Sequence, residues 1–163
     1  MTIRPARTSD MRAVRALVTP LAERRILLQK EAVSYYESTA DFVVADLGER
    51  LVGCGAIHVL WEDLAEVRTL AVADDALGHG VGSALLTALI DRARTLGVRR
   101  LFCLTFETAF FTRHGFAPID GQAVSPEVYA ELLRSYDEGV AEFLDLERVK
   151  PNTLGNTRML RTL

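Results

Sequence analysis

Residues 73–93 read ADDALGHGVGSALLTALIDRA. Gly78, Gly80 and Gly82 take alternate positions, and an apolar run typical of a helix follows at once. Glycine weakens helices and strands alike, so three glycines in this loop indicate that the backbone itself must approach something there. A loop with accessible N–H groups that leads into a helix N-terminus favours an anion such as a phosphate. A plain structural turn is the alternative interpretation.

The spacing of these glycines does not fit two common phosphate-binding motifs. In a dinucleotide fingerprint that starts at Gly78, the last glycine position is occupied by Ser83, and no Gly-Lys-Ser/Thr follows for a P-loop. The bare pattern is weak evidence alone, so the surrounding strands and helices are needed to identify the ligand.

The composition is that of an ordinary globular protein. The chain has 163 residues, 49% hydrophobic and 25% charged, with a formal net charge of -3, which predicts a single domain with no general attraction to nucleic acid or membranes. No apolar run could span a membrane and no signal peptide is recognisable, so we expect a cytoplasmic protein. Cys54 and Cys103 are typical of reduced core cysteines, and the scattered histidines predict no metal site.

The hydrophobic pattern predicts alternating strands and helices. We expect helices at residues 8–25, 30–40, 81–96, 107–115 and 125–137, and strands at 2–6, 41–61 (a hairpin), 65–73, 99–106 and 116–119. Residues 140–163 are expected to add a strand and an irregular end. This order predicts an α/β (α+β) protein with a mixed sheet and helices on both faces.

Local signals predict where several helices begin and end. Thr8 or Ser9 is expected to cap the first helix, and Pro20 to end or kink it. Gly97 is expected to stop the helix at 81–96, and Ser125 to cap the helix at 125–137.

Three segments together resemble the GCN5-related N-acetyltransferase (GNAT) family: EVRTLAV at 66–72, ALGHGVGSALL at 76–86 and FFTRHGF at 110–116. The resemblance covers about residues 2–120 and implies the GNAT fold, a twisted, mixed and mostly antiparallel sheet with helices on both faces. It also implies that the loop cradles the pyrophosphate of acetyl-CoA through the backbone of Gly78, His79, Gly80, Val81 and Gly82.

One position of the loop departs from the family pattern. The pattern Arg/Gln-x-x-Gly-x-Gly/Ala falls on Leu77, Gly80 and Gly82, so Leu77 replaces an Arg or Gln. This loses a side-chain contact but no backbone N–H group, so the resemblance still implies that Leu77 and the glycines bind CoA.

Longer segments are similar to the short, single-domain N-acetylglutamate synthases, and residues 136–160 to their actinobacterial branch. This similarity implies acetyl transfer to the α-amino group of glutamate or glutamine, the first step of arginine biosynthesis. A homodimer is the family expectation. Residues 1–163 would form one acetyltransferase domain, with about 121–163 as its C-terminal extension.

The resemblance assigns roles along the strand at 65–73. The N–H of Leu70 would face the thioester oxygen, and Val72 would pair with the pantetheine arm. Glu66 would act as general base, often through water. Independently of the resemblance, His58 on the neighbouring strand is a second candidate base by the chemistry of its side chain. Alternation places Glu66, Arg68, Leu70 and Val72 on one side of the strand. The alternatives are a Glu66–Arg68 pair at a solvated strand end, and a histidine that belongs to the core.

The acceptor carboxylate calls for cations or N–H donors. Lys30 stands where the resembled group usually has an arginine, and Arg68 is a second candidate cation; a solvated charge at a helix start is the alternative for Lys30. Thr69, Thr105 and Glu107 are further candidate contacts, although Glu107 would repel glutamate unless it points away.

Phe111 occupies a position where the family often has a tyrosine that protonates the leaving thiolate. Solvent would then supply that proton, and Phe111 is expected to lie beside the cofactor. The substitutions at Phe111 and Leu77 leave open a non-catalytic CoA-binding sensor. A second alternative keeps the enzyme but changes the acceptor to another small amine or a protein N-terminus.

Overall fold

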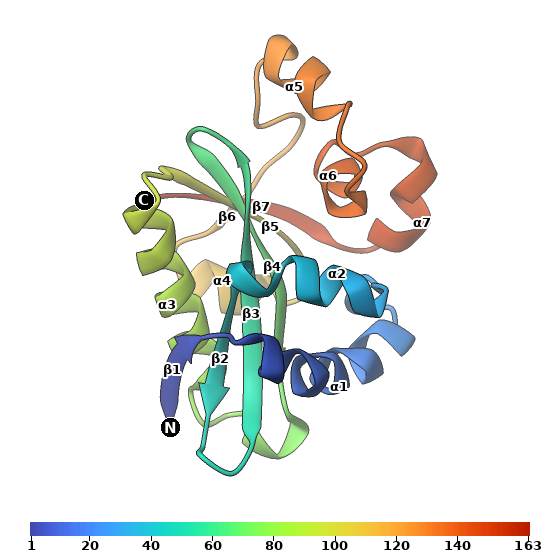
Figure 1. Cartoon of the computed structure of the whole chain (residues 1–163). Coiled ribbons are helices and arrows are strands. Elements are labelled where there is room, and N and C mark those ends of the chain that lie inside the picture. The colour runs from blue at the N-terminus through green and yellow to red at the C-terminus, as the bar shows by residue number, and fades with distance from the viewer. The chain divides into compact units, whose positions relative to one another are not determined.

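The computed structural model describes residues 1–163, which form seven strands and seven α-helices (Figure 1). The strands are β1 (Thr2–Pro5), β2 (Phe42–Asp46), β3 (Leu51–Trp61), β4 (Leu64–Val72), β5 (Arg100–Thr105), β6 (Ala117–Pro118) and β7 (Thr157–Thr162). The helices are α1 (Met11–Glu23), α2 (Ala32–Glu37), α3 (Val81–Thr95), α4 (Thr108–Arg113), α5 (Pro126–Leu132), α6 (Glu138–Phe143) and α7 (Lys150–Thr153). None of these helices combines the length and apolar character needed to cross a membrane.

The strands form one sheet in the order β1-β2-β3-β4-β5-β7-β6. β1 pairs antiparallel with β2, and β2 with β3, while β4 and β5 are parallel, with Glu66 opposite Phe102. β7 pairs antiparallel with both β5 and β6. The expected mixed, mostly antiparallel α/β fold is confirmed.

The chain divides into two compact units, each made of separate stretches of sequence. Unit 1 comprises residues 1–58 and 67–96, and unit 2 comprises residues 59–66 and 97–163. Strands β3 and β4 therefore contribute residues to both units.

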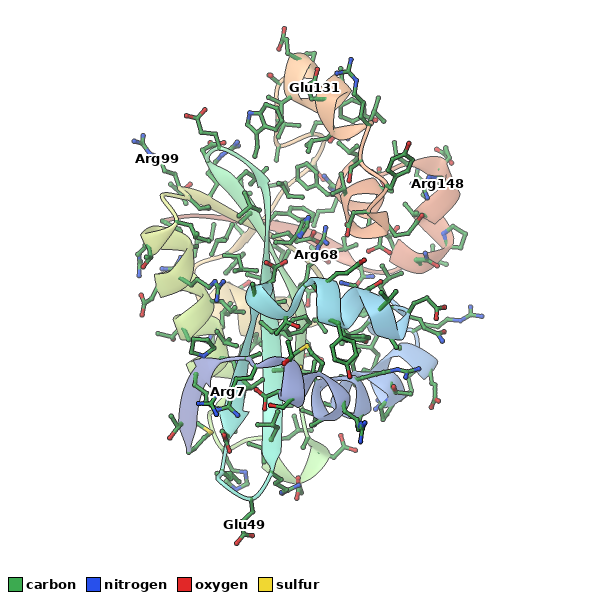
Figure 2. The ribbon with its side chains drawn as sticks, in the orientation of Figure 1. Arg7, Glu49, Arg68, Arg99, Glu131 and Arg148 are labelled. Carbon is green, nitrogen blue, oxygen red and sulfur yellow. The ribbon has the colours of Figure 1, made fainter.

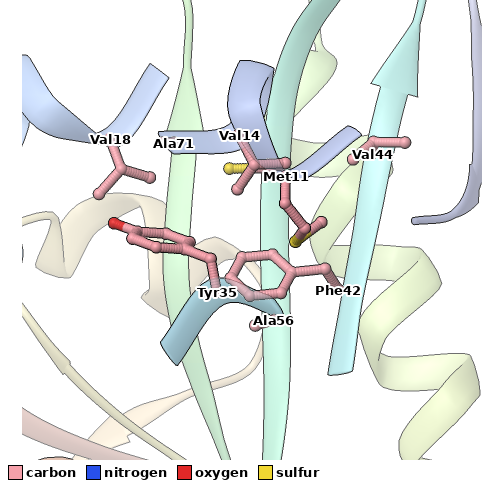
Figure 3. Close-up of a cluster of buried hydrophobic side chains, with 9 residues drawn as sticks. Met11, Val14, Val18, Tyr35, Phe42, Val44, Ala56 and Ala71 are labelled. Carbon is pink, nitrogen blue, oxygen red and sulfur yellow. The ribbon is translucent and has the colours of Figure 1, made fainter. Parts of the chain in front are cut away.

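Helices cover both faces of the strands in unit 1. Cys54 of β3 belongs to a core cluster with residues of α1 and α2, and Figure 3 shows its aromatic members Tyr35 and Phe42, whose ring centroids are 6.3 Å apart. The neighbouring Gly53 and Gly55 face α3, where an added Cβ would come within 2.9 Å of a leucine side chain. The two glycines therefore allow α3 to pack closely on this face.

The first helix differs from the expected cap, and it does not end at Pro20. Thr8 and Ser9 lie in a short 3-10 turn, and the N-cap of α1 is Asp10. Pro20 lies inside α1, and the helix continues to Glu23. It ends where Arg25 adopts a φ of 57° and the N–H of Ile26 donates to the carbonyl of Leu21 at 2.8 Å. A proline forfeits one helical hydrogen bond but need not end a helix.

Helix α3 and the strands lie where the sequence predicts them, but the C-terminal third differs. Gly97 follows α3 with a φ of 83°, as expected of a stop, and Ser125 accepts a hydrogen bond from the N–H of Val128. The helix after Ser125 ends at Leu132 instead of residue 137. Residues 140–163, expected to add a strand and an irregular end, contain the last part of α6, then α7, and end in the strand β7.

Unit 2 has its own core around Phe102 of β5. The ring of Phe143 from α6 packs edge-on against Phe102, with centroids 4.9 Å apart. The guanidinium of Arg158 from β7 lies 5.0 Å from the centre of the Phe102 ring and donates to the carbonyl of Phe143 at 2.8 Å. Arg158 thus connects the segment that contains α6 to the strands of this unit.

Candidate active site

The glycine loop at the start of α3 has the backbone conformation that an anion cradle requires. Gly78 and Gly80 both have a φ of 79°, and no atom lies within 4 Å of a Cβ built on either. Gly80 is the N-cap of α3, whose first N–H groups have no acceptor inside the helix. His79 and Leu77 are exposed, and the His79 Nδ1 lies 2.9 Å from the Leu77 carbonyl oxygen. The open, N–H-rich loop fits a diphosphate.

Strand β4 is irregular at Thr69, immediately before Leu70. Thr69 has a φ of 56°, a left-handed conformation that is rare for a β-branched residue. After the strand, the N–H of Ala73 donates to the carbonyl of Val52 of β3 at 2.9 Å. The expectation that Glu66, Arg68, Leu70 and Val72 share one side assumed a regular strand, and Thr69 interrupts that alternation.

Within unit 1, Cys54 and its neighbouring glycines on β3 contact the irregular segment of β4. The Sγ of Cys54 lies 3.7 Å from the carbonyl oxygen of Thr69. A Cβ on Gly55 would lie 3.1 Å from the Cδ1 of Leu70, so the Leu70 side chain uses space that only glycine leaves. Sequence reasoning treated Cys54 as ordinary core and overlooked the glycines. The Gly-Cys-Gly sequence inside a strand was the available signal for a close backbone approach.

Three other candidates of unit 1 lie on different elements. Lys30 is half-buried in the connection between α1 and α2. Arg68 is half-buried on β4, and in Figure 2 it lies over the ribbon, whereas Glu49 projects from its turn. His58 of β3 places its Nδ1 3.5 Å from a carboxylate oxygen of Asp41. This carboxylate gives His58 a structural partner, which neither the core interpretation nor the role as base anticipated.

Unit 2 contains the remaining candidates. Glu66 is 4% exposed, which does not fit a solvated strand end. Thr105 is buried at the end of β5, and its hydroxyl accepts from the N–H of Glu107 at 2.9 Å. Glu107 is exposed and is the N-cap of α4. Phe111 is buried edge-on against Phe116, with centroids 5.2 Å apart.

Arg158 is the charged residue near Glu66 that sequence reasoning missed. Burial lowers the pKa of Arg158 from its ordinary value, and the negative charges of Asp145 and Glu66 oppose that shift. Glu66 therefore lies in the field of a cation from β7. An arginine in the alternating TRMLRT sequence, which contains Arg158 and Arg161, is only a weak signal, because such positions are usually solvated.

Comparison with known proteins identifies the family. Residues 11–116 match the sequence model of the acetyltransferase (GNAT) family. This match spans more than half of the chain, and the fold and the glycine loop agree with it. The chain belongs to the GNAT family.

Within the family, the similarity is strong over the full length. The chain is 54% identical to the amino-acid acetyltransferase of Mycobacterium tuberculosis, over 99% of this chain and 94% of the relative. It superposes with a TM-score of 0.97 on the crystal structure of Rv2747 from Mycobacterium tuberculosis in complex with CoA and NLQ, at 54% identity, covering 100% of this chain and 99% of that one.

Longer proteins share the same region. N-acetylglutamate synthase from Neisseria gonorrhoeae, complexed with coenzyme A and N-acetyl-glutamate, matches with a TM-score of 0.79 at 26% identity, over 99% of this chain but 35% of that one. The amino-acid acetyltransferase of Neisseria meningitidis is 35% identical over 71% of this chain and 27% of its own length. The similarity thus covers about a third or less of these longer enzymes.

Proposed function

We propose that this chain transfers the acetyl group of acetyl-CoA to the α-amino group of L-glutamate or L-glutamine. It is an amino-acid acetyltransferase of the N-acetylglutamate synthase type, EC 2.3.1.1. The 54% identity to the Mycobacterium tuberculosis enzyme over nearly the whole of both chains is the observation that carries this conclusion. The glycine loop and the irregular β4 support it independently.

Acetyl-CoA is the cosubstrate and supplies an activated thioester. The N–H groups of residues 78–82 hold its pyrophosphate, because the two left-handed glycines leave the loop without side chains in the way. Val72 pairs through its backbone with the pantetheine arm. Leu77 contributes backbone, since its apolar side chain offers no hydrogen bond to a phosphate.

Leu70 and Glu66 are the residues that we assign to the reaction itself. The N–H of Leu70 donates to the thioester oxygen and stabilises the negative charge that develops there. Glu66 takes a proton from the substrate ammonium, directly or through water, and the free amine attacks the carbonyl carbon. The new C–N bond forms as the C–S bond breaks, and the attacking nitrogen loses its second proton to solvent to give the neutral amide. Because Phe111 has no proton to donate, the CoA thiolate leaves as such and is protonated by solvent.

The acceptor is held by its charged groups. Lys30 and Arg68 bind carboxylates, which suits an anionic amino acid better than a polycation. Thr69 and Thr105 are the proposed polar contacts. Glu107 would repel glutamate, but its exposure at the start of α4 allows the carboxylate to stay in solvent. His58 remains the second candidate base, because a carboxylate such as Asp41 beside its ring can orient a histidine for proton transfer.

We further propose the setting in which the enzyme works. Acetylation of glutamate places it at the first step of arginine biosynthesis. The two cysteines are free and buried, which is compatible with the reducing cytoplasm. A homodimer is the assembly we propose, with CoA and the amino acid as its small-molecule ligands; neither nucleic acid nor a membrane is a partner in this proposal.

The test measures free thiol released from acetyl-CoA with each of the twenty amino acids offered separately. Turnover confined to glutamate, glutamine or both is the expected result, and it identifies the acceptor directly. CoA binding without turnover on any amino acid would contradict the proposal and favour the non-catalytic sensor. Turnover on other amines alone would retain the enzyme class but reject the acceptor.

A further inference from the structure

Leu70 lies in a segment of β4 that the fold must hold in an unfavourable conformation. The preceding Thr69 has a φ of 56°, a strained conformation that persists only where the surrounding contacts offset it. The segment from Thr69 to Ala71 must therefore receive compensating contacts. Residues of unit 1 supply such contacts on both faces of the strand.

On one face, the thiol of Cys54 joins the two peptide groups that flank Leu70. Its Sγ lies 3.7 Å from the carbonyl oxygen of Thr69, and the N–H of Ala71 hydrogen-bonds to the same sulfur. Cys54 is 0% exposed, and burial raises its pKa to about 12, although the Ala71 hydrogen bond opposes the shift. The thiol thus keeps its proton at neutral pH and donates it to Thr69.

On the other face, close packing against Gly55 positions the side chain of Leu70. A Cβ on Gly55 would come within 3.1 Å of the Leu70 Cδ1 and within 2.9 Å of the Leu89 Cδ1 of α3. Leu70 is thus held in position from this side, while Cys54 fixes the backbone before and after it.

We propose that Cys54 is a positioning residue for acetyl transfer: by joining Thr69 to Ala71, its thiol sets the direction of the Leu70 N–H. The inference rests on the proposed role of that N–H at the thioester oxygen. Cys54 touches no substrate itself. Loss of one such donor lowers the rate by about 10²–10³-fold, so a misdirected donor should lower kcat by roughly ten-fold.

The experiment compares Cys54→Ala with Cys103→Ala, which removes the other buried thiol from β5. We expect kcat to fall for Cys54→Ala by a much larger factor than the affinity for CoA, whose pyrophosphate is bound by the glycine loop. Cys103→Ala should keep both values. Cys54→Ser retains a donor and an acceptor and should recover part of the lost kcat, even if Cys54→Ala folds poorly.

An amide NMR spectrum separates this inference from the function on which it rests. In the wild type, the Leu70 amide signal should respond differently to CoA and to a non-hydrolysable acetyl-CoA analogue, and in Cys54→Ala that difference should vanish. A wild-type signal that responds equally to both ligands would reject the role of Leu70, and the inference with it. A differential response that persists in Cys54→Ala, or an equal loss of kcat in Cys103→Ala, would overturn the inference alone.

Discussion

Glu66 is a carboxylate buried in β4, and its substitution by glutamine changes the charge without changing the shape. Because Glu66→Gln cannot accept the proton of the substrate ammonium, we expect kcat/KM to fall by about 10²–10⁴-fold, as for other general bases. Steady-state kinetics with saturating acetyl-CoA measure the effect. Glu62→Gln, on the exposed turn that follows β3, is the matched control and should keep wild-type activity. Equal activity of the two variants would reject Glu66 as the base.

Lys30 is expected to act on the acceptor alone. Loss of a charge-assisted hydrogen bond is worth about 1.5–3 kcal/mol, so Lys30→Ala should raise the KM of glutamate by roughly ten-fold or more while leaving the KM of acetyl-CoA unchanged. Lys30→Arg should retain most of the affinity. Arg24→Ala removes an exposed cation from the same connection and serves as control. A glutamate KM that is unchanged in Lys30→Ala would support the solvated-charge alternative.

At the residue scale, the sequence allowed the glycine loop to be predicted but not the irregular strand. A glycine's conformational freedom belongs to the residue itself, so the positive φ of Gly78 and Gly80 was foreseeable. Nothing in EVRTLAV marks Thr69, because its conformation depends on contacts made by Cys54 on another strand. The electrostatic influence between Arg158 of β7 and Glu66 was hidden for the same reason.

Two glycines at opposite ends of α3 allow the stability effect and the binding effect of the loop to be separated. Gly80 before the helix and Gly97 after it have φ values of 79° and 83°, and neither would bring a Cβ within 4 Å of another atom. Alanine at either position should destabilise the fold by about 1–2 kcal/mol, the cost of a left-handed non-glycine residue. Only Gly80→Ala should also raise the KM of acetyl-CoA. Thermal unfolding and kinetics measured together would show whether the two effects separate.

The start of α1 predicts a pH dependence of stability. Arg4 donates to Asp10 at 2.7 Å, and this hydrogen bond lowers the pKa of Asp10, although burial opposes it. The stabilisation is therefore present above the ordinary carboxyl pKa of about 3.9 and is lost as the pH falls through the lower, folded value. Asp10→Asn should reduce the free energy of unfolding at pH 7 by about 1–3 kcal/mol, and the difference from wild type should shrink below about pH 4.

Chemical denaturation at several pH values tests this prediction. Asp91→Asn removes an exposed carboxylate that pairs with Arg94 three residues later, and it should have little effect at any pH. An Asp10→Asn deficit that stays constant from pH 7 to pH 3 would contradict the assignment.

At the element scale, length and periodicity explain which predictions succeeded. Helix α3 spans fifteen residues with a continuous apolar face, and its bounds were predicted closely. Helices α6 and α7 have only six and four residues, too few for a period to emerge. Pro20 lies inside α1 and does not end it; the helix ends only before Arg25, whose φ is positive.

The two compact units are interleaved in sequence, and we propose that they form one cooperative domain. The chain passes from one unit to the other at residues 58–59, 66–67 and 96–97, so neither unit consists of one continuous segment. Calorimetry should give a single transition whose calorimetric and van't Hoff enthalpies agree. Two resolved transitions would show that the units unfold separately.

At the scale of the whole molecule, the fold class followed from the order of elements, but the position of β7 did not. Consecutive strands are usually neighbours, whereas β7 lies between β5 and β6, which precede it in the chain. Its register, with Phe102 opposite Leu160 and Ala117 also opposite Leu160, is set by tertiary pairing. Alternation within a six-residue strand cannot specify which neighbours it will have.

Because β7 is the last strand in the sequence, its position in the sheet also has a consequence for folding during synthesis. On a ribosome, β5 and β6 emerge first, and their missing neighbour is made only after α5, α6 and α7. Until then one edge of β5 and the short β6 present unpaired backbone groups, which are prone to pair with another nascent chain. Yield of the folded protein should therefore be sensitive to how long translation pauses between Pro118 and Thr157, a step at which chaperone binding would be most useful.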